Sequence, residues 1–296
     1  MAVALSKEGY FGFALQTEKG AYVAPTTWLP LIDAESVAAQ LNYVLLNMAD
    51  RNDYQSKYYG AGRWAAGRLP LPVVPGSVTD LLLWIQARDS DNQGKWASAL
   101  TDCIQTVKKL TDAKVRRATF RLEKGEPVTC LLDIVALSIE AGTPASPVMP
   151  TAAPYIFREA SVQLTTGGGP LAADVNCERI EIVADNVVED PAEGMRLRDA
   201  DEPLQLYNLS GIRCTGAFDR DFVDSAVYDD FLSGTEAALT VTLARGASTC
   251  SLMLPRLLYV GDSVGLPGAA DQRLVERVNF VALGSTDGLT PPIILA

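Results

Sequence analysis

The sequence contains no histidine. Histidine is the most frequent general base near neutral pH and the commonest metal ligand, so its absence removes the usual designs of an enzyme active site and of a metal centre. Cysteine is scarce, and the five residues are widely spread and never in a Cys-x-x-Cys spacing, which favours neither a disulfide framework nor a zinc site. We expect no enzymatic activity, no cofactor and no metal, with free cysteines buried in strands. The cysteines are Cys103, Cys130, Cys177, Cys214 and Cys250.

Long apolar runs and positive charge are also missing. No stretch of about 18 apolar residues occurs, and the N-terminus lacks a basic region followed by an apolar run, so neither a membrane span nor a secretory signal is expected. The 25 lysines and arginines are outnumbered by 36 acidic residues, which gives a net charge of −11. A surface of this average charge repels phosphates, so we expect no specific nucleic-acid binding.

Three local patterns point to chemistry, and each is incomplete. Residues 89–95 (DSDNQGK) begin like a calcium loop, but Leu100 stands where a bidentate glutamate is required. Residues 165–171 (TTGGGPL) are glycine-rich but lack the lysine of a phosphate loop. Acidic residues in 199–202 and 218–224 alternate with strand residues, which is typical of a solvated face. None of the three predicts a site.

The chain contains two similar hairpin patterns. RATFRLEKGEPVTCLLDIVALS (117–138) and ALTVTLARGASTCSLMLPRLLY (238–259) alternate apolar and polar residues around a turn. Gly125 or Gly246 in each turn can take a positive φ. One short helix candidate precedes each hairpin and further strands flank both. We interpret the chain as a tandem duplication, each half having the order strand, long loop, strand, helix, hairpin, strand.

The predicted fold class is mainly β, with two tandem β-sandwich or barrel domains, each carrying one flanking α-helix and a long loop. The proline-rich stretch 142–154 is the expected linker. The first domain would span 1–150, with an insertion at about 86–112 between helix and hairpin. The second would span 151–296.

The two helix candidates are residues 77–88 and 224–234. Ser77 and Asp224 are N-cap residue types, and Gly234 suits a helix stop. Each candidate carries an apolar stripe at i, i+3, i+4 that we expect to lie on a sheet. The stripes are Leu81, Trp84 and Ile85 in the first and Tyr228, Phe231 and Leu232 in the second.

The opening stretch YFGFALQTEKGAYVAPTTWLPLIDAES (10–36) resembles the start of tail tube proteins of long-tailed (siphovirus-type) bacteriophages. It has a short strand with glycine, a glutamate-to-proline stretch from Glu18 to Pro25, and a strand containing Leu29 and Pro30. The second half resembles the same family's tube domain, with a long loop, a strand pair and an acidic helix closing in FLSG. The resemblance covers the whole chain, in a tandem-duplicated tube-domain form.

This resemblance implies a structural virion protein whose tube domains join their inner strands into a β-barrel around a lumen. Stacked rings would form the tail tube, the conduit for DNA ejection. Two domains per chain imply a homotrimer as a pseudo-hexameric ring, and a hexamer is the alternative if one half is peripheral. The implied partners are further copies of the chain, the tape measure protein, tail terminator or distal tail proteins, and genomic DNA passing without specific binding. Assembly would take place in the host bacterial cytoplasm, with no membrane involved.

Two groups of residues are candidates for these roles. An acidic inner sheet would repel phosphates and let DNA slide, and the candidates for lining the lumen are Glu178, Glu181, Asp219 and Asp221. The N-terminal segment 1–12 and the loops 40–62 and 186–205 are expected to form ring-to-ring contacts. The candidates there are Tyr10, Phe11, Tyr54, Tyr58, Tyr59, Met195 and Arg196. The basic cluster 108–117 is either part of an acid–base contact between subunits or a solvated stretch.

Two alternatives remain at this stage. One is the inner tube protein of a contractile injection system, although such proteins usually have a single domain. The other is a β-sandwich module that binds carbohydrate or protein, which would need an exposed aromatic platform. All four tryptophans lie in the first half, at Trp28, Trp64, Trp84 and Trp96.

Overall fold

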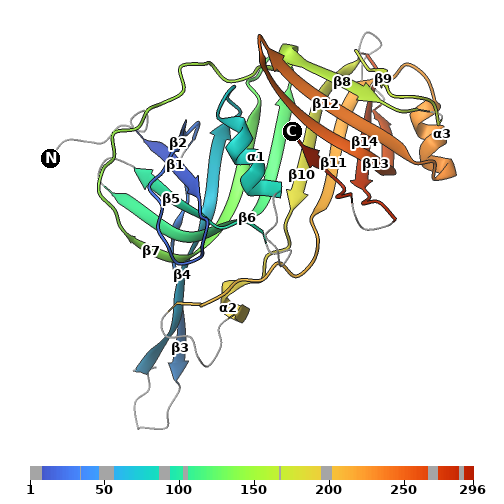
Figure 1. Cartoon of the computed structure of the whole chain (residues 1–296). Helices are drawn as coiled ribbons and strands as arrows, with labels where there is room; N and C mark the ends of the chain where they lie inside the picture. Colours follow the sequence, from blue (N-terminus) through green and yellow to red (C-terminus); the bar gives the residue numbers. More distant parts are fainter. Residues whose placement is uncertain are drawn as a thin grey trace.

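A computed structural model describes residues 9–33, 35–46, 57–86, 94–102, 106–166, 168–194, 202–265, 273–286 and 290–296. Fifteen strands join in one sheet, and every pairing in it is antiparallel (Figure 1). Three short α-helices and one 3-10 turn complete the described part. The expectation of a mainly β protein is confirmed.

Seven strands and one helix follow one another in the same order in the two halves of the chain, and the second half has η2, α2 and β15 in addition. The first half contains β1 (Tyr10–Leu15), β2 (Thr27–Pro30), β3 (Ala38–Leu46), β4 (Lys57–Pro72), α1 (Val78–Gln86), β5 (Ala97–Asp102), β6 (Val107–Glu123) and β7 (Thr129–Ala141). The second half contains η2 (Phe157–Glu159), β8 (Ala160–Leu164), β9 (Ala172–Ala173), β10 (Cys177–Asp185), α2 (Pro191–Gly194), β11 (Arg213–Asp221), α3 (Ala226–Ser233), β12 (Ala237–Arg245), β13 (Ser248–Gly265), β14 (Val275–Ala282) and β15 (Ile294–Leu295).

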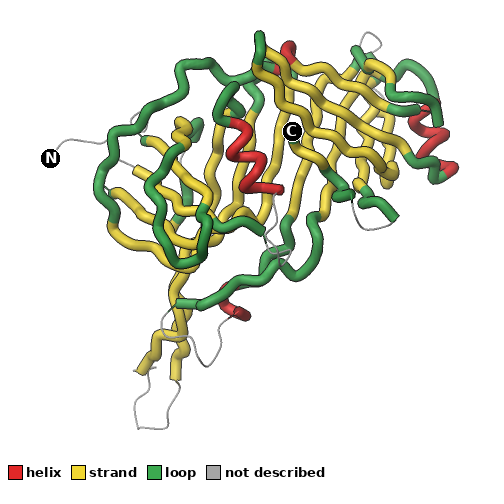
Figure 2. The backbone as a smooth tube through the Cα atoms, in the orientation of Figure 1, coloured by secondary structure: helices red, strands yellow, loops and turns green. Residues whose placement is uncertain are grey.

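Strand pairing is also the same in the two halves. Across the sheet, the first half has the order β2-β1-β5-β6-β7-β4-β3 and the second has β9-β8-β12-β13-β14-β11-β10. The helix between the fourth and fifth strand of each half is α1 or α3. Figure 2 shows the two halves as curved strand layers standing next to each other.

The β-bulges also lie at equivalent positions in the two halves, so the halves can be aligned residue by residue. A β-bulge adds one residue to one strand and is a local feature, which makes matching bulges good markers of equivalent positions. The shift in β6·β7 lies between Val115 and Arg117, and the shift in β13·β14 lies between Tyr259 and Gly261. A second matching pair is Ala97/Ala99 in β5·β6 and Ala237/Leu239 in β12·β13.

The halves are joined by direct strand pairing rather than by a linker alone. β6 of the first half pairs with β10 of the second half from Arg117↔Asp185 to Glu123↔Arg179. We call this pairing of β6 with β10 the seam. Just beyond its ends, two more backbone hydrogen bonds join the strands, from Asn186 N–H to Arg116 O at 2.9 Å and from Lys124 N–H to Glu178 O at 3.0 Å. The sheet therefore runs without interruption from one half into the other, as Figure 1 shows between β6 and β10.

Helix α1 packs on the sheet as its apolar stripe predicts. Leu81, Trp84 and Ile85 are each 0–1% exposed. The Trp84 ring stacks on Phe13 at 5.1 Å between centroids, and its Nε1–H donates to Ala113 O at 3.3 Å. These contacts confirm the first predicted helix and its buried face.

Helix α3 begins and ends close to the predicted positions, but its predicted stripe is wrong. Gly234 follows the helix with φ of 67°, the left-handed conformation expected of a glycine stop. Tyr228 and Leu232 are exposed, whereas Val227 and Asp230 are buried. The helix is turned so that a carboxylate faces inward, toward a group of charges in the second half.

That group is a buried ion cluster. The Arg220 guanidinium lies 3.0 Å from Glu276 Oε2 and 3.2 Å from Asp174 Oδ2, and all three side chains are at most 8% exposed. The positions equivalent to Arg220, Glu276 and Asp174 in the first half follow from the matched registers. They hold the buried apolar residues Leu71, Cys130 and Leu29.

The structure corrects the alignment of the two hairpins. Both turn glycines have the expected positive φ, 89° at Gly125 and 60° at Gly246. However, β12–β13 is the first hairpin after α3, and its equivalent is β5–β6, not β6–β7. Most of the expected insertion at 86–112 is therefore part of the sheet, in β5 and the start of β6. The calcium-like stretch 89–95 lies mostly outside the described residues.

Candidate functional site

One face of the sheet, pointing away from the core, carries rows of alternating charge; we call it the charged face. Paired residues along one row are Arg68, Asp133, Arg117, Asp185 and Arg213, on five adjacent strands of both halves. Arg117 Nη2 lies 2.9 Å from Asp185 Oδ2. Opposite charges that face each other across strands stabilise the pairing by about 0.2–1 kcal/mol per pair.

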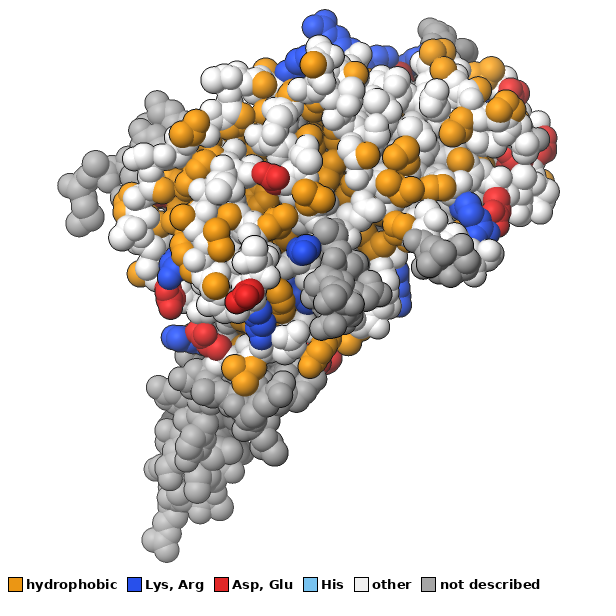
Figure 3. Space-filling view, viewed as in Figure 1, with side chains coloured by type: hydrophobic (Ala, Val, Ile, Leu, Met, Phe, Trp, Pro, Cys, Tyr) orange, Lys and Arg blue, Asp and Glu red, His pale blue; other side chains and the backbone are white. Residues whose placement is uncertain are grey.

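A second row repeats the alternation with Glu123, Arg179, Asp219 and Arg277. Two rows lie between them. One is uncharged and consists of Leu131, Thr119, Val183, Thr215 and Val281, and the other contains the pair Arg121 and Glu181. The charged face therefore has bands in which each acid stands beside a base. On the side of the molecule drawn in Figure 3, basic and acidic side chains likewise lie next to each other at several places.

All four predicted acidic candidates lie on this face or at its end, and each has a basic partner. Glu181 lies 3.1 Å from Arg121, Asp219 lies 3.9 Å from Arg277, and Asp221 lies 2.8 Å from Arg273. Sequence alternation located the carboxylates but not the arginines opposite them, because those come from strands distant in the chain.

Glu178 has two basic partners, Arg273 at 2.6 Å and Lys124 at 3.0 Å. A hydrogen bond from Arg273, which has the larger effect, and one from Lys124 hold the pKa of this carboxyl below its usual range. Below that lowered pKa the carboxyl is protonated and the two pairings are lost, so they are present at neutral pH.

Eight strands form the layer that carries the charged face, in the order β3-β4-β7-β6-β10-β11-β14-β13, and within the described residues this layer is open at both ends. At one end, β3 pairs only with β4. At the other end, one edge of β13 pairs with β12 as far as Leu257. From residue 258 onward, that edge of β13 has no strand beside it among the described residues. Because the bulges match Val115 with Tyr259, the unpaired stretch of β13 is equivalent to the part of β6 that pairs with β10. The two strands that join the halves, β6 and β10, thus have counterparts at the two ends of this layer. The counterpart of β6 is β13 and that of β10 is β3, and neither is paired on the corresponding edge.

The first of these edges is partly capped by side chains. Val37, just before β3, has its N–H bonded to Glu35 Oε2 and its carbonyl oxygen bonded to Lys108 Nζ. Glu35 and Lys108 also pair with each other at 2.6 Å, and the glutamate side chain is 3% exposed. Covering an edge with charged side chains hinders indiscriminate strand pairing. Lys108, the first residue of the basic cluster 108–117, therefore makes an internal contact.

The segment between β10 and β11, described for 186–194 and 202–212, crosses onto the first half; we call it the crossing segment. Val188 and Leu206 pack with Trp96, Val135 and Leu137 of the first half. These apolar contacts are supplemented by a buried amine: Lys114 Nζ donates to Leu206 O at 2.7 Å and to Asn208 Oδ1 at 3.0 Å. Of the expected loop 186–205, the described residues Asn186, Val188 and Glu189 are thus buried against the body.

The equivalent segment of the first half behaves differently. Most of the expected loop 40–62 is the β3–β4 hairpin, which projects from the body in Figure 1. Leu41 on β3 is 54% exposed. The tip, 47–56, lies outside the described residues.

The residues predicted to form ring-to-ring contacts differ in their surroundings. Phe11 is 0% exposed and stacks near Phe13 and Trp84, so it belongs to the core and cannot make such a contact. The Tyr10 hydroxyl donates to Asp102 Oδ2 at 2.6 Å and so has an internal partner. The remaining candidates, Tyr54, Tyr58, Tyr59, Met195 and Arg196, are outside the described residues or have side chains that are not described.

Other kinds of site find little support. Trp28, Trp84 and Trp96 are at most 9% exposed, and Trp64 is half-buried, so none provides an open aromatic platform. No three His, Cys, Asp or Glu side chains in the described ranges are grouped as metal ligands. None of the described helices is long and apolar enough to cross a membrane.

The described cysteines are buried and free, as expected. Burial raises the pKa of Cys177 and Cys214 to about 12 and that of Cys250 to about 11, and it raises the pKa of Cys130 still further. These thiols are therefore protonated at neutral pH and poorly nucleophilic. Cys103 lies outside the described residues.

The described part is mainly β, with open strand edges and a solvent face of paired charges, and these features suit a structural protein. The family model described as phage tail tube protein matches residues 28–282, and the chain belongs to this family. It is thus a structural component of a phage tail and of the virion.

The other two comparisons add little. A chain from the six-fold symmetrised baseplate of the anti-feeding prophage is similar at 14% identity with a TM-score of 0.34, over 52% of this chain and 97% of that one. No curated protein matches the chain.

Proposed function

We propose that this chain polymerises into stacked rings that form the tail tube of a long-tailed phage, through which DNA is ejected. The observation that carries the proposal is the seam between the halves. Inside one chain, β6 and β10 already join two units of the same strand order. Their equivalents, β13 and the β3 side, have no strand partner on their outer edges and lie at opposite ends of the described eight-strand layer.

Repeating the seam between chains would continue the sheet around a ring. The expected pairing follows from two equivalences. Tyr259 of β13 corresponds to Val115 of β6, and the register of β3 with β4 corresponds to that of β10 with β11. Val264 of one copy would then lie opposite Val37 of the next. Each copy would add the strands β3-β4-β7-β6-β10-β11-β14-β13 to the inner wall.

Three copies per ring is the arrangement we favour. Both halves supply four strands to the charged face, which supports a place in the wall for each half rather than the peripheral half that a hexamer of chains would require. Three chains would give six similar units, consistent with an origin by tandem duplication. Closed rings of identical contacts also remove the open edges that would otherwise invite aggregation.

The charged face would line the lumen. A wall in which the arginines of both charged rows stand opposite carboxylates offers DNA few free cations, so few counterions are released on contact and DNA is not retained. The fully acidic lumen expected from the sequence is replaced in this proposal by a charge-compensated one.

Removing acids from one row is expected to make the tube bind DNA. In an Asp133→Asn/Asp185→Asn variant, Arg68, Arg117 and Arg213 lose the carboxylates opposite them in register. Assembled tubes should then bind short duplex DNA, and this affinity should fall steeply with salt by roughly 0.9 log units per log unit of salt for each phosphate contacted. Fluorescence anisotropy of labelled DNA measures the effect.

The control carries the same change in net charge elsewhere. Glu18→Gln/Asp229→Asn alters an exposed loop and an exposed helix position away from the charged face. DNA binding by the control, or none by the first variant, would contradict the lumen assignment.

The remaining partners follow from a place in the tail. They are further copies of this chain, a tape measure protein during assembly, and terminator or distal tail proteins at the tube ends, with assembly in the host cytoplasm. Electron microscopy of the concentrated purified protein tests the function itself. Stacked rings of three chains with six similar lobes are the expected result, and particles that remain monomeric with and without partners would contradict it.

A further inference from the structure

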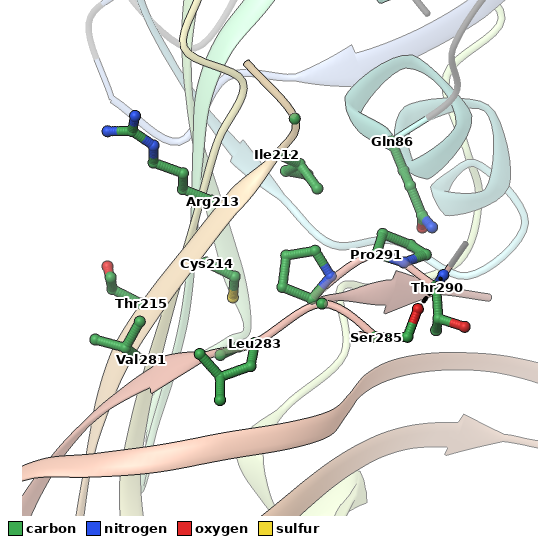
Figure 4. A pocket seen from close by; sticks show the side chains of 14 residues that line it. Gln86, Ile212, Arg213, Cys214, Thr215, Val281, Leu283, Ser285, Thr290 and Pro291 are labelled. Atoms are coloured by element: carbon green, nitrogen blue, oxygen red, sulfur yellow. Dashed lines mark hydrogen bonds between the residues drawn. The ribbon is translucent and has the colours of Figure 1, made fainter. Parts of the chain in front are cut away.

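The last residues of the chain lie against helix α1 of the first half. Leu295 N–H donates to Gln86 Oε1 at 2.6 Å. Figure 4 shows the Gln86 side chain pointing from α1 toward Pro291, which comes shortly before β15. Leu82 and Leu83 of α1 line an apolar groove of about 430 Å³ together with Leu295. The outward face of α1 therefore contacts a segment of the second half, across the boundary between the halves.

Strand β15 has a counterpart in the first half, at the end of β7. β15 pairs with β13 through Leu252↔Leu295, and the end of β7 pairs with β6 through Lys108↔Ala141. The matching bulges align Lys108 with Leu252, so Ala141 is the equivalent of Leu295. In both places the next residue along the chain donates its backbone N–H to the carbonyl oxygen of the residue before Lys108 or Leu252.

Helix α3 is the counterpart of α1, and its outward face is apolar and exposed. The register of β4 with β7 matches that of β11 with β14, and counting on along the chain makes Leu232 the equivalent of Leu83 and Tyr228 that of Thr79. The burial pattern agrees, because Leu83 and Leu232 are 47% and 64% exposed and the residue two positions before each is buried. Tyr228 is 43% exposed, and its ring centroid lies 6.3 Å from that of Phe231.

We propose that the face of α3 formed by Tyr228, Phe231 and Leu232 is the docking site for residues 140–145 of the next copy in the ring. The inference rests on the proposed ring assembly and adds a contact outside its inner wall. In that ring, the first half of the next copy stands to α3 as the second half of the same chain stands to α1. Ala141 would then meet α3 where Leu295 meets α1.

Residues 140–145 (EAGTPA) suit this place. Most of them are exposed, and small side chains with one proline let aromatic rings pack closely against the backbone. The stretch is already fixed on its own half, because Gly142 N–H donates to Val107 O at 2.8 Å and Ala145 N–H donates to the Tyr10 hydroxyl at 3.1 Å. Little ordering is therefore needed on docking. In Figure 1, α3 and β1, which begins at Tyr10, lie at opposite ends of the molecule, so one chain cannot close this contact on itself.

A pair of cysteines tests the contact directly. In an Ala141→Cys/Leu232→Cys variant, a short bis-maleimide cross-linker should join different chains in assembled tubes, giving covalent dimers and trimers on a denaturing gel, and none in the dilute monomer. The matched control is Leu83→Cys/Leu295→Cys, at the equivalent contact inside one chain, which should be bridged within the monomer. The unmodified chain gives the background, and its described cysteines are buried.

A charge on α3 provides a second measurement. Leu232→Glu lies at an exposed position, so folding should be unaffected, and the critical concentration for tube formation should rise at least about tenfold, measured by sedimentation. Leu171→Glu, at another exposed leucine, should assemble like the unmodified chain. Tubes whose chains are not joined by the Ala141–Leu232 cysteine pair, or folded Leu232→Glu assembling at the normal concentration, would overturn the docking site while leaving the tube function standing. An unmodified chain that never self-associates would overturn both.

Discussion

Val264→Pro is expected to abolish tube formation while the monomer stays folded. Even-numbered residues of β6 from Arg116 to Lys124 direct their backbone groups to β10, and by the matched bulges Val264 is the equivalent of Phe120. The Val264 N–H therefore points to the open edge, where proline removes a donor needed only between chains. Electron microscopy and sedimentation should find no tubes, and the melting temperature should change by only a few degrees.

Two neighbouring variants make this result specific. Val264→Thr retains the β-branched side chain and the N–H, so it should assemble normally. Ser263→Pro removes an N–H that points to β14 inside the chain, so it should lower the melting temperature. Tubes formed by Val264→Pro at the normal concentration would show that this edge is not an interface.

The second large effect concerns stability. Arg220→Leu leaves Glu276 and Asp174 buried without the guanidinium that lies within 3.2 Å of both. Breaking a buried ion pair by removing one partner typically costs about 3–5 kcal/mol. For a chain of this size, the melting temperature should fall by roughly 10 °C, which differential scanning calorimetry can measure.

A triple variant separates lost pairing from lost packing. Arg220→Leu/Asp174→Leu/Glu276→Cys reproduces the buried trio of the first half, Leu71, Leu29 and Cys130. Well-packed apolar replacements of buried ion pairs are often neutral or stabilising, so this variant should regain most of the loss. If it is less stable than Arg220→Leu alone, or if the single change has no effect, the cluster does not contribute as described.

Local patterns predicted the local features of this fold well. The stripe Leu81, Trp84 and Ile85 is buried, and Gly234 ends α3 in the left-handed conformation. These features depend on residues within one or two turns of chain, which the sequence displays directly. The stripe of α3 failed because it treats apolar residues as the buried face, whereas the structure buries Asp230 and leaves Tyr228 and Leu232 exposed.

Long-range pairing could not be predicted in the same way. Nothing in the sequence of β6 distinguishes β10, which begins more than fifty residues after β6 ends, as its neighbour. The alignment of the two hairpins was also wrong, because a glycine turn between two strands has the same sequence pattern in any hairpin. The pattern therefore matched β12–β13 with β6–β7 instead of with β5–β6. Consequently the acids of the charged face were found, but the arginines opposite them, such as Arg121 and Arg277, were not.

The most direct test of this account is the strand register at the boundary between chains, read from an electron cryo-microscopy reconstruction of assembled tubes. The account predicts β13 of one chain paired with the β3 side of the next, with Val264 opposite Val37, in the arrangement already present between β6 and β10. A ring in which chains meet through other strands, or in which one half lies outside the wall, would contradict it.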